Sequence, residues 1–206
     1  MEIRPTRRPD VAPGAALMAR AFANEHPFVW IEPDADARLR FNQALFRAAL
    51  GHLYPPGSGP EVAVEGGDIV GCAIWSRSGV RPSVLQQAGA AITMIRGAGL
   101  AGLRSAGPRG TALEEALQSA RPQQPHWLLV GIAVKPELQG KGVGAALLRH
   151  GLERSERDGL PAYLECLEPL VPYYERHGFC HLHWIDMPEG AARQAGMLRE
   201  PAAAPK

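Results

Sequence analysis

The chain has 206 residues, of which 46% are hydrophobic and 21% are charged, a composition that suits one globular domain, which we place at residues 1–200. Its formal net charge of +1 gives no general attraction to nucleic acid or to a membrane surface, so we expect neither as a partner. The three cysteines, Cys72, Cys166 and Cys180, have no metal-like spacing, and their odd number argues against a disulfide framework.

The N-terminal half predicts a strand, two helices and a hairpin. EIRPTR is typical of a strand, and Asp10 is placed to cap a first amphipathic helix. A second helix is expected between Pro33 and Gly51 because apolar residues recur there at helical spacing. EVAVEGGDIVGCAIWS predicts two strands joined at Gly66 and Gly67. The charged segment MEIRPTRRPD has no apolar stretch of the signal-peptide kind, so we expect a cytoplasmic protein.

The second half predicts a helical insertion followed by alternating strands and helices. Residues 79–125 are rich in Gly, Pro and Ala, and their apolar part is too polar and too broken to span a membrane. HWLLVGIAV is typical of a strand buried on both faces, and a glycine loop leads from it into a helix ending near Arg157. PAYLECL predicts a strand, PYYERH a short helix, HLHWIDM a last strand, and residues 201–206 a disordered tail. The fold class is therefore mixed α/β.

The glycine loop LQGKGVGAALL has the features of an anion site. A helix N-terminus carries unpaired N–H groups, and glycines let an anion approach the backbone closely. Lys141 adds a cation and Gln139 an amide donor. A tight strand-to-helix turn is the alternative explanation of the glycines. The loop fits neither a P-loop, because Lys141 is followed by Gly142, nor the dinucleotide fingerprint, because it has GxGxG in place of GxGxxG.

Two motifs carry a family resemblance. IAVKPELQGKGVGAALL resembles the acetyl-CoA motif of the GCN5-related N-acetyltransferases (GNAT), and YYERHGF, residues 173–179, is similar to the motif that closes the same fold. A closer likeness, to the puromycin N-acetyltransferases, rests on RPQQPHWLL, QGKGVG, PAYLE and YERHGF. The resemblance implies the GNAT fold, in which a mixed, mostly antiparallel sheet is flanked by helices. Here a helical insertion would precede the central strand.

The resemblance also implies an acetyl-CoA site. The strand at Ile132, Ala133 and Val134 would splay from its neighbour, commonly at a β-bulge, so that pantetheine inserts there. The pyrophosphate would then lie on seven consecutive residues: Gln139, Gly140, Lys141, Gly142, Val143, Gly144 and Ala145. Tyr174 matches the family's tyrosine, which stays protonated at neutral pH and can donate a proton to the leaving thiolate. The family's asparagine before this tyrosine has no counterpart, since Leu170 stands there.

The proton acceptor is less well defined by the sequence. Glu165 is the first choice because it lies on the PAYLECL strand, although it could equally face away or pair with an arginine. Weaker candidates are Glu168, His126 and the pair Glu25 and His26. We expect no metal site, since His181 and His183 lack a third ligand. We expect Cys166 to be a small apolar side chain of the core.

The resemblance implies an enzyme that moves acetyl from acetyl-CoA to an amine, and we expect the primary amine of a small molecule. The alternatives are acetylation of a protein N-terminus or lysine, and a sensor that binds acyl-CoA without turnover. We expect an aromatic or apolar acceptor under a roof formed by the insertion and the first helices. The proposed roof residues are Leu85, Ile92, Met94, Ile95, Leu100, Phe28 and Trp30. The insertion could instead pack only on its own domain or form a homodimer contact.

Overall fold

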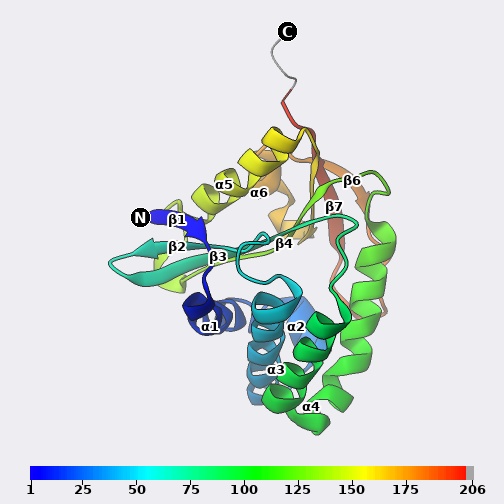
Figure 1. Cartoon of the computed structure of the whole chain (residues 1–206). Coiled ribbons are helices and arrows are strands. Elements are labelled where there is room, and N and C mark those ends of the chain that lie inside the picture. The colour runs from blue at the N-terminus through cyan, green and yellow to red at the C-terminus, as the bar shows by residue number, and fades with distance from the viewer. Residues whose placement is uncertain (203–206) are drawn as a thin grey trace.

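The computed structural model describes residues 1–202 and contains a seven-stranded sheet with the order β1-β2-β3-β4-β5-β7-β6 (Figure 1). Neighbouring strands are antiparallel except for β4 and β5, which are parallel. The strands are β1 Glu2–Pro5, β2 Glu61–Glu65, β3 Asp68–Arg77, β4 Trp127–Val134, β5 Ala162–Leu167, β6 Cys180–Trp184 and β7 Gln194–Arg199. The expected mostly antiparallel sheet is confirmed. The predicted tail falls partly at residues 203–206, which lie outside the described residues.

Helices cover both faces of the sheet. Figure 1 shows α5 and α6 on one side and α1, α2, α3 and α4 on the other. The helices are α1 Val11–Ala21, α2 His26–Ile31, α3 Ala35–Ala48, α4 Val84–Ala120, α5 Val143–Asp158 and α6 Val171–Glu175. The α/β class and the helical insertion are therefore as expected, whereas the short α2 was not predicted. Within residues 1–202, no helix combines the length and the apolar character needed to cross a membrane.

The alternation of β3 divides the core into two parts. Cys72 and Ile74 face α1 and α3, while Ala73 and Trp75 face α5. All four side chains are almost completely buried. Because successive strand residues point to opposite faces, an apolar run such as GCAIW is what a strand covered on both faces requires. The β2–β3 turn at Gly66 and Gly67 has φ values of 60° and 89°, which suit a two-residue hairpin.

The predicted cap at Asp10 is wrong. The Asp10 carboxylate makes no capping bond to α1; it accepts instead from Arg4 at 2.6 Å and from the backbone N–H of Arg7 at 2.7 Å. The short helix at residues 8–10 precedes α1 directly, so Asp10 is already in a helical conformation. An N-cap side chain needs an extended backbone to reach the following N–H groups.

The C-terminal strands also differ from expectation. HLHWIDM does not contain the last strand, because β7 follows and lies between β5 and β6. Leu182 is an extra residue in the β6–β7 register, which breaks the alternation expected of His181 and His183. His181 is exposed and packs on Trp184, whereas the Nε2 atom of His183 is buried. The bulge therefore separates two histidines that a regular strand would align.

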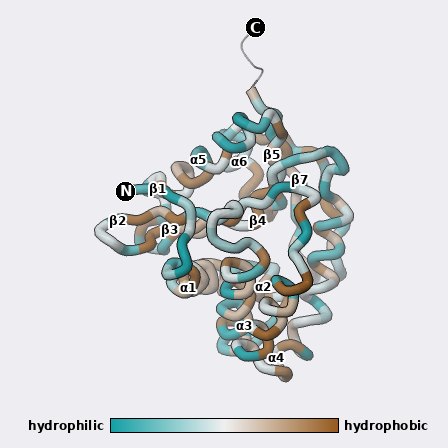
Figure 2. The backbone as a smooth tube through the Cα atoms, in the orientation of Figure 1, coloured by the Kyte–Doolittle hydropathy of each residue, from teal (hydrophilic) through white to brown (hydrophobic). Residues whose placement is uncertain are grey.

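The insertion forms α4, which is broken at Gly99, where φ is 70° and ψ is 168°. The first half packs closely on α3, since a Cβ at Gly97 would lie only 2.6 Å from the Cβ of Ala44. The second half turns away and rises towards β7 (Figure 1). Figure 2 shows hydrophilic and hydrophobic residues alternating along α3 and α4, as expected of amphipathic helices. The two halves of α4 therefore run in different directions on either side of Gly99.

We expect Gly151→Ala to lower the free energy of unfolding by about 1–3 kcal/mol. A Cβ at Gly151 in α5 would overlap the indole ring of Trp75, which is fully buried and cannot move aside. Alanine is otherwise the better helix former by about 1 kcal/mol, so the overlap has to outweigh that gain. Urea denaturation measures the change. Gly110→Ala is the matched control, because nothing lies near its added Cβ, and it should not destabilise; equal stability of the two variants would contradict the packing argument.

Candidate active site

The strands β4 and β5 diverge at the centre of the sheet. Their parallel pairing ends at Leu129 and Leu164, although both strands continue. Opposite β3, Val130 is an extra residue between Leu129 and Gly131, so β4 carries a β-bulge at this point. Val130 is 39% exposed, which corrects the expectation of a strand buried on both faces. The bulge and the lost pairing leave backbone groups of β4 accessible beside β5.

A cavity of about 290 Å³ lies at this divergence. We call it the apolar cavity. Its walls are residues 129–133 of β4, residues 164–167 of β5, and side chains from the four helices α1, α2, α4 and α6. The helical and loop contributors are Ala21, Phe22, Glu25, Pro27, Phe28, Leu113, Leu117, Gln139, Leu170 and Tyr174, with Gln194 from β7. An apolar chamber with a few polar groups, at a break in a sheet, is a typical small-molecule site.

The two tyrosines of YYERHGF point to different places. Tyr174 is buried and lines the apolar cavity next to Cys166. Burial raises the pKa of the Tyr174 hydroxyl, and the nearby Cys166 and Tyr173 raise it further. Tyr173 lies outside the cavity lining, and its hydroxyl is 3.7 Å from where a Cβ on Gly144 would be. Adjacent helical residues differ by about 100° in direction, which separates the two side chains.

The N-terminus of α5 is open. No side chain caps it, and Gly142 has a φ of 86°. Within residues 1–202, the first intrahelical bond from this turn is the one that Ala146 donates to Gly142, which leaves the N–H groups of residues 142–145 without a backbone acceptor. The N–H of Lys141 donates to the carbonyl of Leu138. A Cβ at Gly140 or Gly142 would meet nothing within 4 Å, so the space in front of the helix is clear. Gln139 is the residue of this loop that also lines the apolar cavity.

Glu165 lines the apolar cavity and forms an ion pair. Its Oε1 accepts from Nε of Arg121 at 2.7 Å, and Arg121 also reaches Glu114 at 3.1 Å. Burial raises the pKa of Glu165, and the Arg121 guanidinium partly offsets this by lowering it. Glu165 therefore pairs with an arginine, which was one of the alternatives that the sequence allowed. Sequence reasoning missed Arg121, because its partner is 44 residues away along the chain.

The other candidate proton acceptors have different surroundings. Glu25 lines the apolar cavity and makes no ion pair with any described residue, whereas His26 is exposed. His126 is buried outside this cavity, its Nδ1 lies 2.8 Å from the carbonyl of Gln124, and burial lowers its pKa. Glu168 pairs with Arg193 at the surface. Two carboxylates, Glu25 and Glu165, therefore share the cavity.

The expected roof is wrong in most of its residues. Phe28 lines the apolar cavity, but Trp30 lies elsewhere and donates to the carbonyl of Glu189. The proposed roof residues of α4 lie in its first half or, for Leu100, directly after Gly99, and none of them lines the cavity; Leu85, for example, is 84% exposed. Leu113 and Leu117 from the second half of α4 take that position. The break at Gly99 is the reason, because it directs only the second half towards the sheet.

A family comparison agrees with this geometry. The model of the Acetyltransferase (GNAT) family matches residues 16–179, which include the bulged strand, the glycine loop and both tyrosines. The chain belongs to the GNAT acetyltransferase family. Members of this family use acetyl-CoA, and the fold expected from the two motifs is confirmed.

Solved GNAT structures cover almost the whole chain. A Corynebacterium glutamicum protein described as histone acetyltransferase HPA2 and related acetyltransferase is 26% identical, with a TM-score of 0.72, over 99% of this chain and 98% of that one. An N-acetyltransferase from Staphylococcus aureus has a TM-score of 0.60 at 16% identity, over 96% of this chain and 100% of that one. The ribosomal-protein-S18-alanine N-acetyltransferase of Escherichia coli has a TM-score of 0.56 at 16% identity, over 100% and 96%. The two more distant structures show the shared fold alone.

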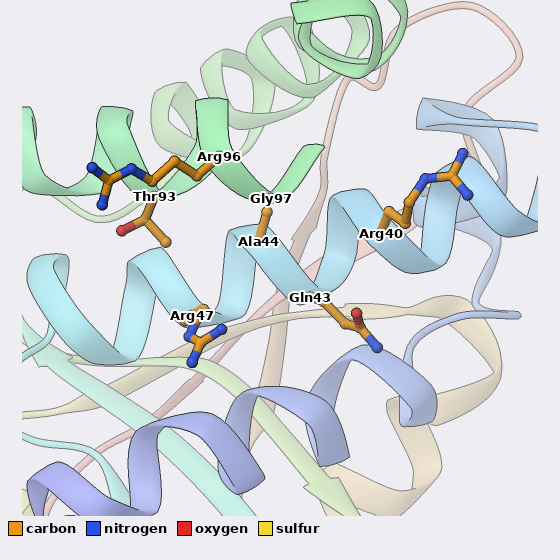
Figure 3. Close-up of a pocket in the computed structure, with 7 residues that line it drawn as sticks. All are labelled: Arg40, Gln43, Ala44, Arg47, Thr93, Arg96 and Gly97. Atoms are coloured by element: carbon orange, nitrogen blue, oxygen red, sulfur yellow. The ribbon is translucent and has the colours of Figure 1, made fainter. Parts of the chain in front are cut away.

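Two further cavities of this GNAT acetyltransferase lie outside the strand divergence. One, the outer cavity, is between α3 and α4 and is lined by Arg40, Arg47 and Arg96; Figure 3 shows that their guanidinium groups point apart. The other is larger, about 490 Å³, and includes Arg121. Within residues 1–202, no three His, Cys, Asp or Glu side chains gather as metal ligands would.

We expect the two buried cysteines of the acetyltransferase to resist alkylation. Burial raises the pKa of Cys72 and of Cys166 to about 12, so at pH 8 only about one thiol in 10⁴ would be ionised. Cys180 is exposed and should react with iodoacetamide first. Peptide mass spectrometry after brief labelling of the folded protein tests this order. Rapid labelling of Cys166 would contradict the burial argument and make this thiol a candidate nucleophile.

Proposed function

We propose that this acetyltransferase moves an acetyl group from acetyl-CoA to the primary amine of a small molecule with an apolar body. The observation that carries the proposal is the apolar cavity. It adjoins the divergence of β4 and β5, and it holds a buried tyrosine and two carboxylates among apolar walls. Three unpaired cysteines suit a reducing compartment, so we propose that the reaction takes place in the cytoplasm.

Acetyl-CoA fits the groups available on one side of the cavity. We propose that Ile132, Ala133 and Val134 of β4 bind the pantetheine through backbone groups that β5 leaves unpaired. Residues 139–145 would bind the pyrophosphate, because the open N–H groups and the helix dipole of α5 favour an anion. The clear space at Gly140 and Gly142 supports this, since a Cβ at either position would project into it.

Tyr174 has the protonation state that the reaction requires. Acetyl-CoA, when bound, supplies an acetyl group already activated as a thioester. Because burial raises the pKa of Tyr174, its hydroxyl keeps its proton at neutral pH and can donate it to the departing thiolate. Backbone N–H groups at the bulge of β4 could donate to the carbonyl oxygen as negative charge develops there.

The carboxylates suit an amine acceptor. An ammonium group entering the cavity is attracted by Glu25 and Glu165 and has to lose its proton before it can attack. Glu165 is our candidate base, because its raised pKa makes it a stronger proton acceptor than an exposed glutamate. Phe22, Phe28 and Leu117 favour an apolar body through burial, at about 25 cal/mol per Å². The likeness of four sequence stretches to puromycin N-acetyltransferases supports the same acceptor class.

Thiol release from acetyl-CoA across a panel of amines tests the proposal. The panel contains puromycin, aminoacyl amides, polyamines and lysine or N-terminal peptides, and mass spectrometry identifies the acetylated product. We expect transfer to apolar or aminoacyl amines. Transfer confined to peptides would favour protein acetylation, and tight acetyl-CoA binding without transfer to any amine would favour a sensor.

We expect Arg121→Gln to move the acidic limb of the kcat/KM profile to higher pH. Arg121 lowers the pKa of Glu165, so without it the pKa rises further, through burial and the nearby Glu114. A base is active when deprotonated, so the active form then requires a higher pH. The measurement is the pH dependence of kcat/KM, with Arg193→Gln, whose partner Glu168 lies at the surface, as the control. An unchanged profile in Arg121→Gln would remove Glu165 from the role of base.

A further inference from the structure

The larger cavity, which we call the polar cavity, adjoins the apolar cavity. It is formed by four residues after α3, by residues 76–82 at the end of β3, by both ends of α4, and by the loop and strand that follow α4. The residues outside 76–82 are Leu53, Tyr54, Pro55, Ser58, Gln86, Glu114, Gln118, Arg121, Pro122, Gln123, His126 and Leu128. Arg121 lines the polar cavity, and its partner Glu165 lines the apolar cavity. The Nε of Arg121 lies 2.7 Å from the Oε1 of Glu165. The two cavities therefore meet at this ion pair.

One helix lines both cavities with different chemistry. Leu113 and Leu117 of α4 face the apolar cavity, whereas Glu114 and Gln118 face the polar cavity. Residues four apart lie on the same helical face, so the two pairs form neighbouring stripes. A molecule lying across this part of α4 would meet an apolar wall at one end and a polar wall at the other.

The surplus charge of the polar cavity is positive. Arg77, Arg81 and Arg121 line it, and Glu114 is the one carboxylate among its lining residues. Arg121 is already paired with Glu114 and Glu165. Arg77 and Arg81 form no ion pair with any residue in the described part of the chain. An anionic group such as a carboxylate is therefore what this lining would bind, through charge-assisted hydrogen bonds.

We propose that the two cavities form one bipartite acceptor site, in which the polar cavity binds a carboxylate carried beyond the apolar body of the acceptor. This inference rests on the proposed function, since the amine has to lie in the apolar cavity near Tyr174. The acceptor class is then an aminoacyl compound that ends in a carboxylate, such as a short peptide-like molecule with an aromatic first residue. A polyamine or a plain apolar amine would use only half of the site.

Phenylalanylglycine and phenylalanylglycinamide are the matched probes, because they differ in the terminal charge alone. We expect the wild-type enzyme to have a KM about tenfold or more lower for the acid, as for one charge-assisted hydrogen bond. The double variant Arg77→Gln/Arg81→Gln should reduce this preference to about twofold or less, with kcat for the amide unchanged. Both arginines are exposed, so the variant should fold. The double variant Arg40→Gln/Arg47→Gln on the outer cavity is the charge-matched control and should keep the preference.

A binding experiment separates failure of this inference from failure of the proposed function. Calorimetry with the two N-acetylated dipeptides needs no turnover, and we expect tighter binding of the acid in the wild type and not in the double variant. Discrimination in binding without acetyl transfer to any amine would overturn the function and leave the carboxylate subsite supported. Transfer with equal KM for acid and amide, or a preference that survives both substitutions, would overturn the subsite and leave the function supported.

Discussion

Replacing Tyr174 with Phe is expected to lower kcat by about 10- to 10⁴-fold, because a general acid typically contributes up to about 10⁴-fold. The substitution removes one oxygen from a side chain that is buried beside the β4–β5 divergence. Because burial raises the pKa of Tyr174, the wild-type hydroxyl stays protonated throughout the neutral pH range and can donate its proton. Acetyl-CoA affinity should change little, since the proposed pyrophosphate contacts lie on residues 139–145. Steady-state kinetics and calorimetry measure the two quantities separately.

Tyr173→Phe is the internal control for this prediction. Tyr173 lies outside the apolar cavity, and its hydroxyl points towards Gly144 at the start of α5. Its loss should therefore affect acetyl-CoA binding more than turnover, and either effect should be small. If Tyr173→Phe abolished turnover while Tyr174→Phe did not, the proton donor would be Tyr173.

Gly142→Val is expected to weaken acetyl-CoA binding by about 10²-fold, as when one or two charge-assisted hydrogen bonds to a phosphate cannot form. An added Cβ meets no protein atom within 4 Å, so the new side chain occupies the space in front of the α5 N-terminus. It would thus obstruct the anion directly. Lys141→Ala should cost less, because backbone N–H groups would make most of the contact.

Backbone strain is the competing effect in this variant. The φ of 86° at Gly142 is unfavourable for valine and should cost about 1–3 kcal/mol of stability. Gly57→Val is the matched control, since Gly57 has a φ of 87°, equally open surroundings and no place in the lining of any cavity described above. Both variants should lose similar stability, and only Gly142→Val should lose affinity. Calorimetry that gives wild-type affinity for folded Gly142→Val would exclude this site.

The local sequence was sufficient to predict the elements whose functional residues are contiguous in the chain. The strand, glycine loop and helix from Trp127 to Asp158 are contiguous, so periodicity and glycine spacing together predict both the turn and an open helix N-terminus. YYERHGF likewise predicts its own helix and its closing glycine, Gly178, whose φ is 84°. β7 was not predicted because QAGMLR has neither the alternation of a strand nor a strong β propensity. It forms a strand because it pairs with β5 on one side and β6 on the other.

The acceptor side of the enzyme was decided by tertiary structure alone. An apolar helical pattern predicts that α4 is amphipathic, but it does not say which half meets the sheet. The backbone at Gly99 turns the second half towards β5, so Leu113 and Leu117 line the cavity and Leu85 and Leu100 remain exposed. The same turn brings Arg121 to Glu165, a contact between residues distant in sequence that no local pattern encodes. Hydrophobic periodicity predicts which face of a helix is buried. It does not predict which segment that face packs against, because this depends on how segments distant in the sequence are arranged in space.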